Sequence, residues 1–155
     1  LLEYSLQLLA PAELVEVSGF AKRGVWAEQT AWKADTNEDE GYAVARFANG
    51  AWLTLTISSI DANPKRGWLE ITGTKGTYLM DGSHYEILLP GGNPSLIKGP
   101  NPASEGWRFY QNIADHLVKD EPLVITGEWA RRPIHILDLA CKSAEKNAAL
   151  KAKYR

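Results

Sequence analysis

Apolar and polar residues alternate over long stretches in the middle of the chain, between residues 41 and 89. Within the segment 52–58, Leu53, Leu55 and Ile57 occupy every second position. Because successive side chains of a β-strand point to opposite faces of the sheet, these three aliphatic side chains share one face. The alternation predicts a strand whose aliphatic face belongs to the hydrophobic core.

A hairpin and further short strands extend this pattern. Asn49-Gly50 lies between two alternating runs and predicts a type I′ turn, in which both central residues have positive φ. Three more apolar runs separated by glycine turns follow, at 67–73, 77–81 and 84–89. The prolines and glycines that come next predict the end of the sheet, because neither residue type extends a central strand.

Helical spacing marks both ends of the chain. The leucines of 1–9 predict a short helix, and the Val- and Phe-rich segment 13–23 predicts a first strand, in which Gly19 favours a bulge. Ser104 is the predicted N-cap of the next helix, and Thr126 is the predicted N-cap of the last one. The predicted buried stripe of that last helix is formed by Ala130, Ile134, Leu137, Cys141 and Ala144.

Together these elements predict the fold class. We expect an α+β domain with an open, mainly antiparallel sheet of about five or six strands and helices packed on one face. The chain has 155 residues, which is enough for one complete hydrophobic core. We therefore expect a single domain over residues 1–155.

The charge balance and the cysteine count bound the partners and the compartment. Seventeen basic and nineteen acidic residues give a formal net charge of −2, so we expect no nucleic acid and no anionic membrane as partners. No apolar run reaches the roughly 18 residues of a membrane span. The single cysteine, Cys141, cannot form an internal disulfide, which fits a reducing compartment, and we expect a cytoplasmic location.

The motifs of a self-contained enzyme are not found in the sequence. There is no Gly-x-Gly-x-x-Gly dinucleotide fingerprint and no Gly-x-Ser-x-Gly nucleophile motif. His135, Asp138 and Cys141 share one helical face, but a packed helix with one buried cysteine explains this run better than a metal. We therefore predict no metal site, and the motifs give no support for nucleophilic catalysis within the chain.

Tryptophans lie on the sheet face opposite the aliphatic one. Trp52, Thr54 and Trp68 combine large aromatic rings with a hydroxyl, a composition typical of contact surfaces. One interpretation is an interface through which copies of the chain form a homo-oligomer such as a dimer. The other is a face covered by loops of the same chain. Exposure of both tryptophans in the monomer would favour the interface.

A polar loop follows the long strand. It runs from Ser58 through Asp61 and Asn63 to Lys65 and Arg66, and so gathers hydroxyls, an amide and two cations. Such a cluster is suited to a hydroxylated or anionic small ligand. A solvated surface loop is the alternative interpretation.

Four segments, in this order along the chain, resemble a known family. They are Gly-Tyr-Ala-Val-Ala-Arg-Phe-Ala-Asn-Gly-Ala-Trp-Leu-Thr-Leu-Thr from residue 41, Leu-Glu-Ile-Thr-Gly-Thr-Lys-Gly-Thr from residue 69, Phe-Tyr-Gln-Asn-Ile-Ala-Asp-His-Leu from residue 109 and Val-Ile-Thr-Gly-Glu-Trp-Ala-Arg-Arg from residue 124. Together they resemble the carboxy-terminal domain of the Gfo/Idh/MocA oxidoreductases, the glucose–fructose oxidoreductase and inositol dehydrogenase family. The resemblance covers nearly the whole chain and implies a dihydrodipicolinate-reductase-like C-terminal domain fold.

The resemblance also implies a two-domain enzyme that uses NAD or NADP and acts on a sugar, polyol or related hydroxy compound. In the family, the cofactor and the catalytic Lys lie in an N-terminal Rossmann domain, which is expected to be absent from this chain, so no cofactor is expected in the chain itself. Glu3 aligns with the last acidic residue of the family's Asp-x-Gly-x-His-x-x-Asp motif, so the chain is expected to begin just after the catalytic His. The expected partners are its own Rossmann domain and a small hydroxylated substrate.

The expected role of the chain is to form the roof of the substrate pocket and to oligomerise through the open sheet face. The residues predicted to bind substrate are Glu3, Lys65, Arg66 and Trp107. The alternative is a non-catalytic α+β module for ligand binding or self-association.

Overall fold

A computed structural model of the chain describes residues 1–33, 35–62, 67–91 and 96–153. These residues fall into two compact units. The first unit comprises residues 2–61 and 126–155, and the second comprises residue 1 and residues 62–125. Both units contain antiparallel strands and helices, so the predicted α+β class is confirmed.

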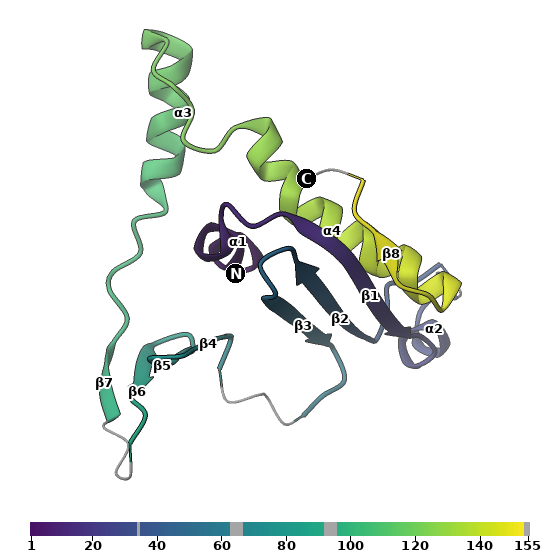
Figure 1. The fold of residues 1–155 in the computed structure, drawn as a ribbon. Coiled ribbons are helices and arrows are strands. Elements are labelled where there is room, and N and C mark those ends of the chain that lie inside the picture. The colour runs from purple at the N-terminus through teal and green to yellow at the C-terminus, as the bar shows by residue number, and fades with distance from the viewer. Residues whose placement is uncertain (34, 63–66, 92–95, 154–155) are drawn as a thin grey trace. The chain divides into compact units, whose positions relative to one another are not determined.

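The sheet of the first unit has four strands in the order β3-β2-β1-β8, and each strand is antiparallel to the strand beside it (Figure 1). The central pair, β1 and β2, is the longest. Side chains alternate in burial along β2, where Ala43, Ala45 and Phe47 are buried. The strands are β1 (Leu14–Lys22), β2 (Glu40–Phe47), β3 (Trp52–Ser58) and β8 (Leu150–Lys151).

The predicted hairpin joins β2 to β3, but its turn is not of type I′. Gly50 has a φ of 85°, whereas Asn49 is not among the residues with positive φ. The Gly50 N–H donates to the Phe47 carbonyl at 3.0 Å, and the Phe47 N–H donates to the Ala51 carbonyl at 2.9 Å. This pattern is a three-residue loop in which a type I turn is followed by a glycine bulge. The Asn49 side chain favours it by accepting a hydrogen bond from the Ala51 N–H at 3.0 Å.

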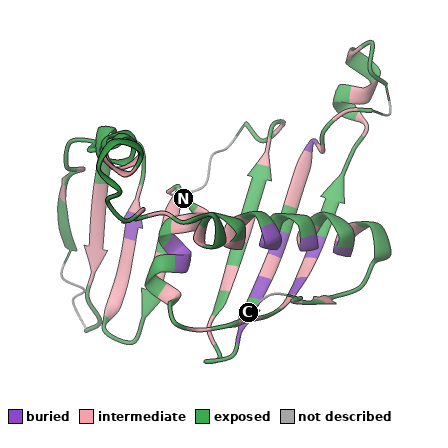
Figure 2. Cartoon of the chain, turned by 90° about the horizontal axis from the view of Figure 1, so that it is seen from above, coloured by how far each residue is buried: buried purple, intermediate pink, exposed green. Residues whose placement is uncertain are grey.

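Helix α4 (Gly127–Lys146) packs on this sheet, mainly on β1 (Figure 2). Thr126 is its N-cap as predicted, because the Thr126 hydroxyl accepts a hydrogen bond from the Trp129 N–H at 3.2 Å. The predicted buried stripe is wrong in position, since Ile134, Leu137 and Cys141 are exposed. Packing against β1 selects a different side of the helix, whose buried residues are His135, Ile136, Leu139 and Ser143.

The close approach of β1 to α4 occurs at Gly19. A Cβ atom at this position would lie 2.0 Å from the backbone oxygen of Ala140. The strand is continuous here, and its one irregularity lies between Leu14 and Glu16, so the predicted bulge at Gly19 is wrong. Glycine stands at this position because the helix backbone occupies the space that a side chain would need.

The hydrophobic core of the first unit lies between the sheet and the helices α1 (Leu2–Leu9) and α4. Leu53 and Leu55 of β3 pack against it as predicted. Ile57 does not pack against the core, because the residue is 74% exposed. The buried members of the core are Leu6, Val17, Ala43, Ala45, Phe47, Ile136 and Leu139.

The second unit contains a separate four-stranded sheet with the order β4-β5-β6-β7. The sequence predicted one sheet of about five or six strands, and the structure instead has two sheets of four, because β4 pairs with β5 and not with β3. The sheet also continues past residues 90–94, since β7 pairs with β6. Pro100 is tolerated because it lies at an edge strand. The strands are β4 (Leu69–Gly73), β5 (Gly76–Met80), β6 (His84–Leu88) and β7 (Leu96–Pro100).

Helix α3 (Trp107–Lys119) belongs to the second unit and has no buried residue. Its N-cap is Gly106 and not Ser104 as predicted, although the Ser104 hydroxyl accepts a hydrogen bond from the Gly106 N–H at 3.4 Å. The helix ends at Asp120, which has a left-handed conformation. Among the described helices, none has the length and apolar character needed to cross a membrane.

Candidate functional site

A cavity of about 690 Å³ lies within the first unit, beside the short helix α2 (Val25–Gln29). We call it the tryptophan pocket. It is formed by α2, by the loop that connects α2 to β2, and by the end of β3. The lining residues that matter for its chemistry are Trp26, Thr30, Trp32, Thr36, Ile57 and Ser59.

The buried carboxylate of Asp39 holds α2 in place. Asp39 is 1% exposed, and its two carboxylate oxygens accept hydrogen bonds from the N–H groups of Val25 at 2.9 Å and Trp26 at 3.0 Å. These N–H groups belong to the first turn of α2, where backbone donors have no partner within the helix. A negative charge there is also favoured by the helix dipole. Asp39 therefore fixes the position of the Trp26 backbone, from which the indole side chain extends.

Ser59 connects Trp26 to the end of β3. The indole N–H of Trp26 donates to the Ser59 hydroxyl oxygen at 2.7 Å, and the Ser59 hydroxyl donates to the Asp39 carbonyl at 3.1 Å. The neighbouring Ser58 hydroxyl accepts hydrogen bonds from the N–H groups of Ile60 and Asp61. The two serines thus fix the wall of the pocket on the β3 side.

Two threonine hydroxyls of the pocket are buried and unpaired. The Oγ1 atoms of Thr30 and Thr36 are inaccessible to solvent and have no hydrogen-bond partner in the described structure. Buried polar groups are almost always paired, and each exception calls for an explanation. Both side chains line the pocket, and a ligand hydroxyl is the kind of group that pairs with a threonine hydroxyl.

The electrostatics of the pocket do not favour an anion. Asp35 and Glu38 are among its lining residues, and no lysine or arginine is among those that the structure describes there. Glu38 forms an ion pair with Arg23. The hydrogen bond from Arg23 is the main reason that the pKa of Glu38 lies below its ordinary value. The arrangement suits a neutral, hydroxylated molecule that can stack on the exposed indole of Trp32.

The two predicted substrate-binding residues that the structure describes lie in different units. Glu3 lies in α1, and Trp107 begins α3 in the other unit. Lys65 and Arg66 lie outside the described residues. The carboxylate oxygens of Glu3 are buried without a hydrogen-bond partner among the described residues, but Glu3 does not line the tryptophan pocket. The assignment of these four residues to substrate stays a prediction.

The predicted interface residues lie in two different sheets. Trp52 and Thr54 are in β3, on the face of the sheet opposite α4. Trp68 directly precedes β4 in the second unit, where its ring lies close to Gly82. The side chains of Trp52 and Trp68 are 70% and 67% exposed. The assignment of these residues to an interface stays a prediction.

Sequence reasoning missed most of the pocket. The hydroxyls of Thr30 and Thr36 are not among the predicted site residues. One signal was present, since Trp26 and Trp32 flank Thr30 within seven residues. Ser58 and Ser59, which belong to the polar loop predicted from the sequence as a candidate ligand site, line the pocket.

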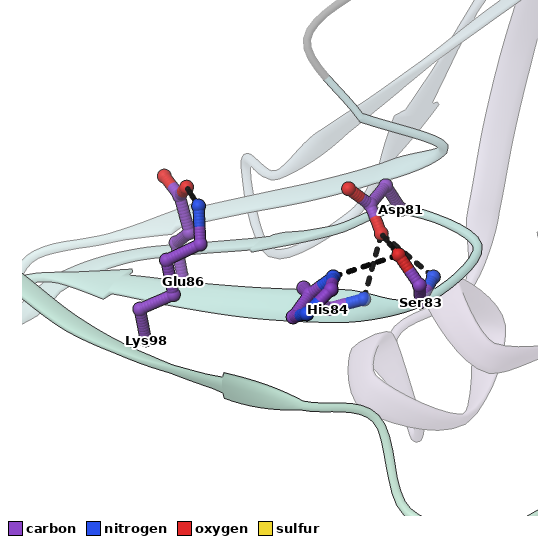
Figure 3. A network of polar contacts seen from close by, with 5 residues as sticks. All are labelled: Asp81, Ser83, His84, Glu86 and Lys98. Carbon is purple, nitrogen blue, oxygen red and sulfur yellow. Dashed lines mark hydrogen bonds and ion pairs between the residues drawn. The ribbon is translucent and has the colours of Figure 1, made fainter.

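A second polar cluster, at the turn between β5 and β6, has a structural role (Figure 3). Asp81 accepts hydrogen bonds from the N–H groups of Ser83 and His84, both at 2.7 Å, and these bonds hold the pKa of Asp81 below its ordinary value. The Ser83 hydroxyl lies 2.7 Å from His84 Nδ1. The Asp81 carboxylate contacts Ser83 and not the far nitrogen of the imidazole, so the arrangement fixes the turn and does not form a catalytic triad.

No group of three His, Cys, Asp or Glu side chains converges as a metal site in the described part of the chain. His135, Asp138 and Cys141, which share one helical face in the sequence, have different surroundings in the structure. His135 is buried, Asp138 pairs with Lys142 at 2.7 Å, and Cys141 is exposed.

Comparison with known proteins identifies the family. Residues 4–79 match the family model described as the GFO/IDH/MocA C-terminal domain. No curated protein sequence matches the chain.

Solved structures share the fold. An NAD-binding oxidoreductase from Klebsiella pneumoniae has a TM-score of 0.71 and 15% identity, with 99% of this chain and 49% of that chain covered. An oxidoreductase from Agrobacterium radiobacter, in complex with NAD⁺, L-tartaric acid and magnesium, has a TM-score of 0.67 and 18% identity, with coverage of 97% and 46%. The WlbA dehydrogenase from Bordetella pertussis, in complex with NADH and UDP-GlcNAcA, has a TM-score of 0.60 and 14% identity, with coverage of 99% and 43%.

The chain thus spans about half the length of these oxidoreductases. Its α+β fold is theirs, and the family model matches the segment that contains α1, the three long strands of the first sheet and the start of the second sheet. Residues 4–79 of the chain belong to the GFO/IDH/MocA C-terminal domain family.

Proposed function

We propose that this chain is the substrate-binding and oligomerising C-terminal domain of an NAD(P)-dependent oxidoreductase that acts on a sugar, polyol or related hydroxy compound. The observation that carries the proposal is the tryptophan pocket, in which two indole rings lie beside two buried, unpaired threonine hydroxyls. Rings that stack on C–H faces and hydroxyls that exchange hydrogen bonds are the groups that recognise a polyol.

The ligands of two structural relatives support this substrate class. The B. pertussis dehydrogenase was solved with UDP-GlcNAcA, and the A. radiobacter oxidoreductase was solved with L-tartaric acid. Both molecules carry hydroxyl groups on carbon. At 14% and 18% identity, these relatives share the fold with this chain, and the substrate itself is our inference.

The residues of this chain bind and orient the substrate, and the cofactor is held elsewhere. NAD or NADP supplies hydride transfer when bound. The strands described here pair antiparallel throughout, so they offer no parallel β-α-β crossover of the dinucleotide-binding kind. We therefore propose that the cofactor and the catalytic residues belong to an N-terminal Rossmann domain, with Glu3, Lys65, Arg66 and Trp107 as additional substrate contacts.

A polyol titration tests the pocket. We expect myo-inositol or sorbitol to perturb the indole signals of Trp26 and Trp32 in two-dimensional NMR spectra of the chain. The double variant Thr30→Val, Thr36→Val keeps the side-chain shape but removes both hydroxyls, and it should weaken binding about fivefold or more. Thr72→Val is the matched control, because Thr72 is exposed in the other sheet. Unchanged affinity in the double variant, or no shift at either tryptophan, would contradict the proposal.

The upstream coding sequence separates the enzyme from the alternative, a non-catalytic binding or self-association module. A Rossmann fingerprint, with a His codon directly before Leu1 and an Asp codon four residues before that His, is the expected result. A start codon close to Leu1 would support the module instead.

The open face of the first sheet supports the oligomerising role. On the face opposite α4, the exposed rings of Phe20, Tyr42 and Trp52 alternate with the buried residues of their strands. Phe20 is paired with Tyr42 across the strands, and their ring centroids are 6.3 Å apart. Thr54 lies opposite Val44 on the same face. Exposed aromatic patches of this kind are typical of protein interfaces.

Replacing Trp52 by glutamate should dissociate the oligomer. We expect light scattering to give a multiple of the chain mass for the wild type and the monomer mass for Trp52→Glu, because a charge in an aromatic interface weakens association by about thirtyfold or more. Leu117→Glu, on the exposed side of α3, is the control that keeps the wild-type mass. Trp68→Glu tests separately whether Trp68 contributes. A monomeric wild type, or an unchanged mass for Trp52→Glu, would exclude this face.

A further inference from the structure

A second cavity lies within the first unit, between α1 and the first three turns of α4. We call it the α1–α4 cavity. Its volume is about 330 Å³, at the lower end of the range for small-molecule sites. It shares no lining residue with the tryptophan pocket. Most of its wall is apolar and includes Leu6, Phe47 and Ile136 of the hydrophobic core.

Arg132 brings a positive charge into this wall. Its guanidinium carbon lies 4.3 Å from the centroid of the Trp129 ring, so the two side chains stack. One guanidinium nitrogen lies 3.4 Å from the carbonyl oxygen of Leu6, which is a long hydrogen bond to a neutral acceptor. No carboxylate forms an ion pair with Arg132 among the described residues. A guanidinium carries five N–H donors, so donors remain for a ligand.

Trp129 contributes a buried donor without an acceptor. The indole Nε1 atom is inaccessible to solvent, and the described structure contains no hydrogen-bond partner for it. Leaving such a donor unpaired is unfavourable for the folded state. Trp129 also lines the cavity, directly beside Arg132. The cavity therefore has the stacked pair of Arg132 and Trp129 in its wall, and the rest of its wall is mainly aliphatic and aromatic carbon.

The other titratable groups of the wall limit the charge of a ligand. Burial is the main cause that lowers the pKa of His135, so the imidazole adds no positive charge at neutral pH. Its Nε2 atom accepts a hydrogen bond from the Lys153 N–H at 3.3 Å. Glu13 and Arg131 add one charge of each sign and interact with other residues. The charges of Glu13 and Arg131 cancel, so Arg132 leaves the wall with one net positive charge. A ligand with a single negative charge balances it, and a ligand with two does not.

We propose that the α1–α4 cavity binds a small monocarboxylate with an apolar body, whose carboxylate is held by the Arg132 guanidinium and the Trp129 indole N–H. The planar fork of arginine fits a carboxylate in two parallel hydrogen bonds. The apolar body contacts Leu6, Phe47 and Ile136. Because these side chains belong to the core, an occupied cavity stabilises the folded first unit.

Benzoate is the probe, and benzamide is its uncharged counterpart of the same shape. Titration of the 155-residue chain with benzoate should shift the indole N–H signal of Trp129 in NMR spectra and raise the melting temperature. Benzamide and inorganic phosphate should do neither at the same concentration. Arg132→Gln should weaken benzoate binding about tenfold or more, because it removes a charge-assisted hydrogen bond.

Two further variants make the result decisive. Trp129→Phe keeps a ring but removes the N–H group, and it should weaken benzoate binding about fivefold. Arg108→Gln is the matched control, because Arg108 also stacks on a tryptophan, at 5.5 Å from the Trp107 ring, but lies in the other unit. It should bind like the wild type. Equal binding of benzamide or phosphate, undiminished benzoate affinity in folded Arg132→Gln and Trp129→Phe, or shifts confined to Trp26 and Trp32 would overturn the proposal.

Discussion

Among the Gly→Ala substitutions at the glycines that the structure describes, Gly19→Ala should destabilise the chain most. The new Cβ would lie 2.0 Å from the Ala140 carbonyl oxygen and 2.8 Å from the Ala140 Cα. These are backbone atoms of α4, which cannot turn away as the end of a flexible side chain can. The strand and the helix would have to separate, and the buried hydrogen bond from the Gly19 N–H to the Ser143 hydroxyl, now 2.8 Å, would be lost.

We expect the free energy of unfolding to fall by about 3 kcal/mol or more in this variant. Urea unfolding followed by circular dichroism measures the change. Gly127→Ala is the matched control, since a Cβ at Gly127 meets no atom within 4 Å at the start of the same helix. Its stability should equal or slightly exceed that of the wild type. A Gly19→Ala chain as stable as the control would show that β1 and α4 do not pack as closely as described.

Removal of the Asp39 carboxylate should both destabilise the first unit and abolish ligand binding in the tryptophan pocket. In Asp39→Ala, the N–H groups of Val25 and Trp26 lose their acceptors, and a buried space is left behind. We expect a loss of about 2–3 kcal/mol, typical of a buried, charged helix cap. Polyol binding should be lost because α2 no longer holds the Trp26 indole against Ser59.

Two comparison variants test this explanation. Asp39→Asn retains one carbonyl acceptor and should lose about half as much stability as Asp39→Ala. Asp138→Asn removes an exposed carboxylate that pairs with Lys142 four residues later, so its effect should stay below about 0.5 kcal/mol. Urea unfolding gives the stabilities, and the NMR titration gives the binding. Full polyol affinity in folded Asp39→Ala would mean that Asp39 does not position the pocket.

The turn type of the hairpin and the buried side of α4 were predicted wrongly, because each depended on small differences in local geometry. Asn49-Gly50 specified a hairpin, but the Asn49 side chain caps the Ala51 N–H and selects a three-residue loop in place of a two-residue one. Ile134 and Leu137 are as apolar as Ile136 and Leu139, so periodicity could not decide which pair α4 would bury. The contact with β1 at Gly19 made that choice.

The tryptophan pocket shows a larger gap between sequence and structure. Thr30 and Thr36 gave no sequence signal of their own, because their importance lies in being buried without a partner. Trp26 and Ser59 are 33 residues apart and meet only through a hydrogen bond between α2 and the end of β3. The α1–α4 cavity likewise joins residues near the start of the chain to residues beyond 128.

The sequence by itself determined the α+β class, the antiparallel hairpin and the Thr126 helix cap, because each rests on interactions between residues that are close together in the chain. The tertiary structure decided the division into two four-stranded sheets, the buried side of α4 and both cavities. These depend on contacts between segments far apart in the chain, whose energies no local pattern contains.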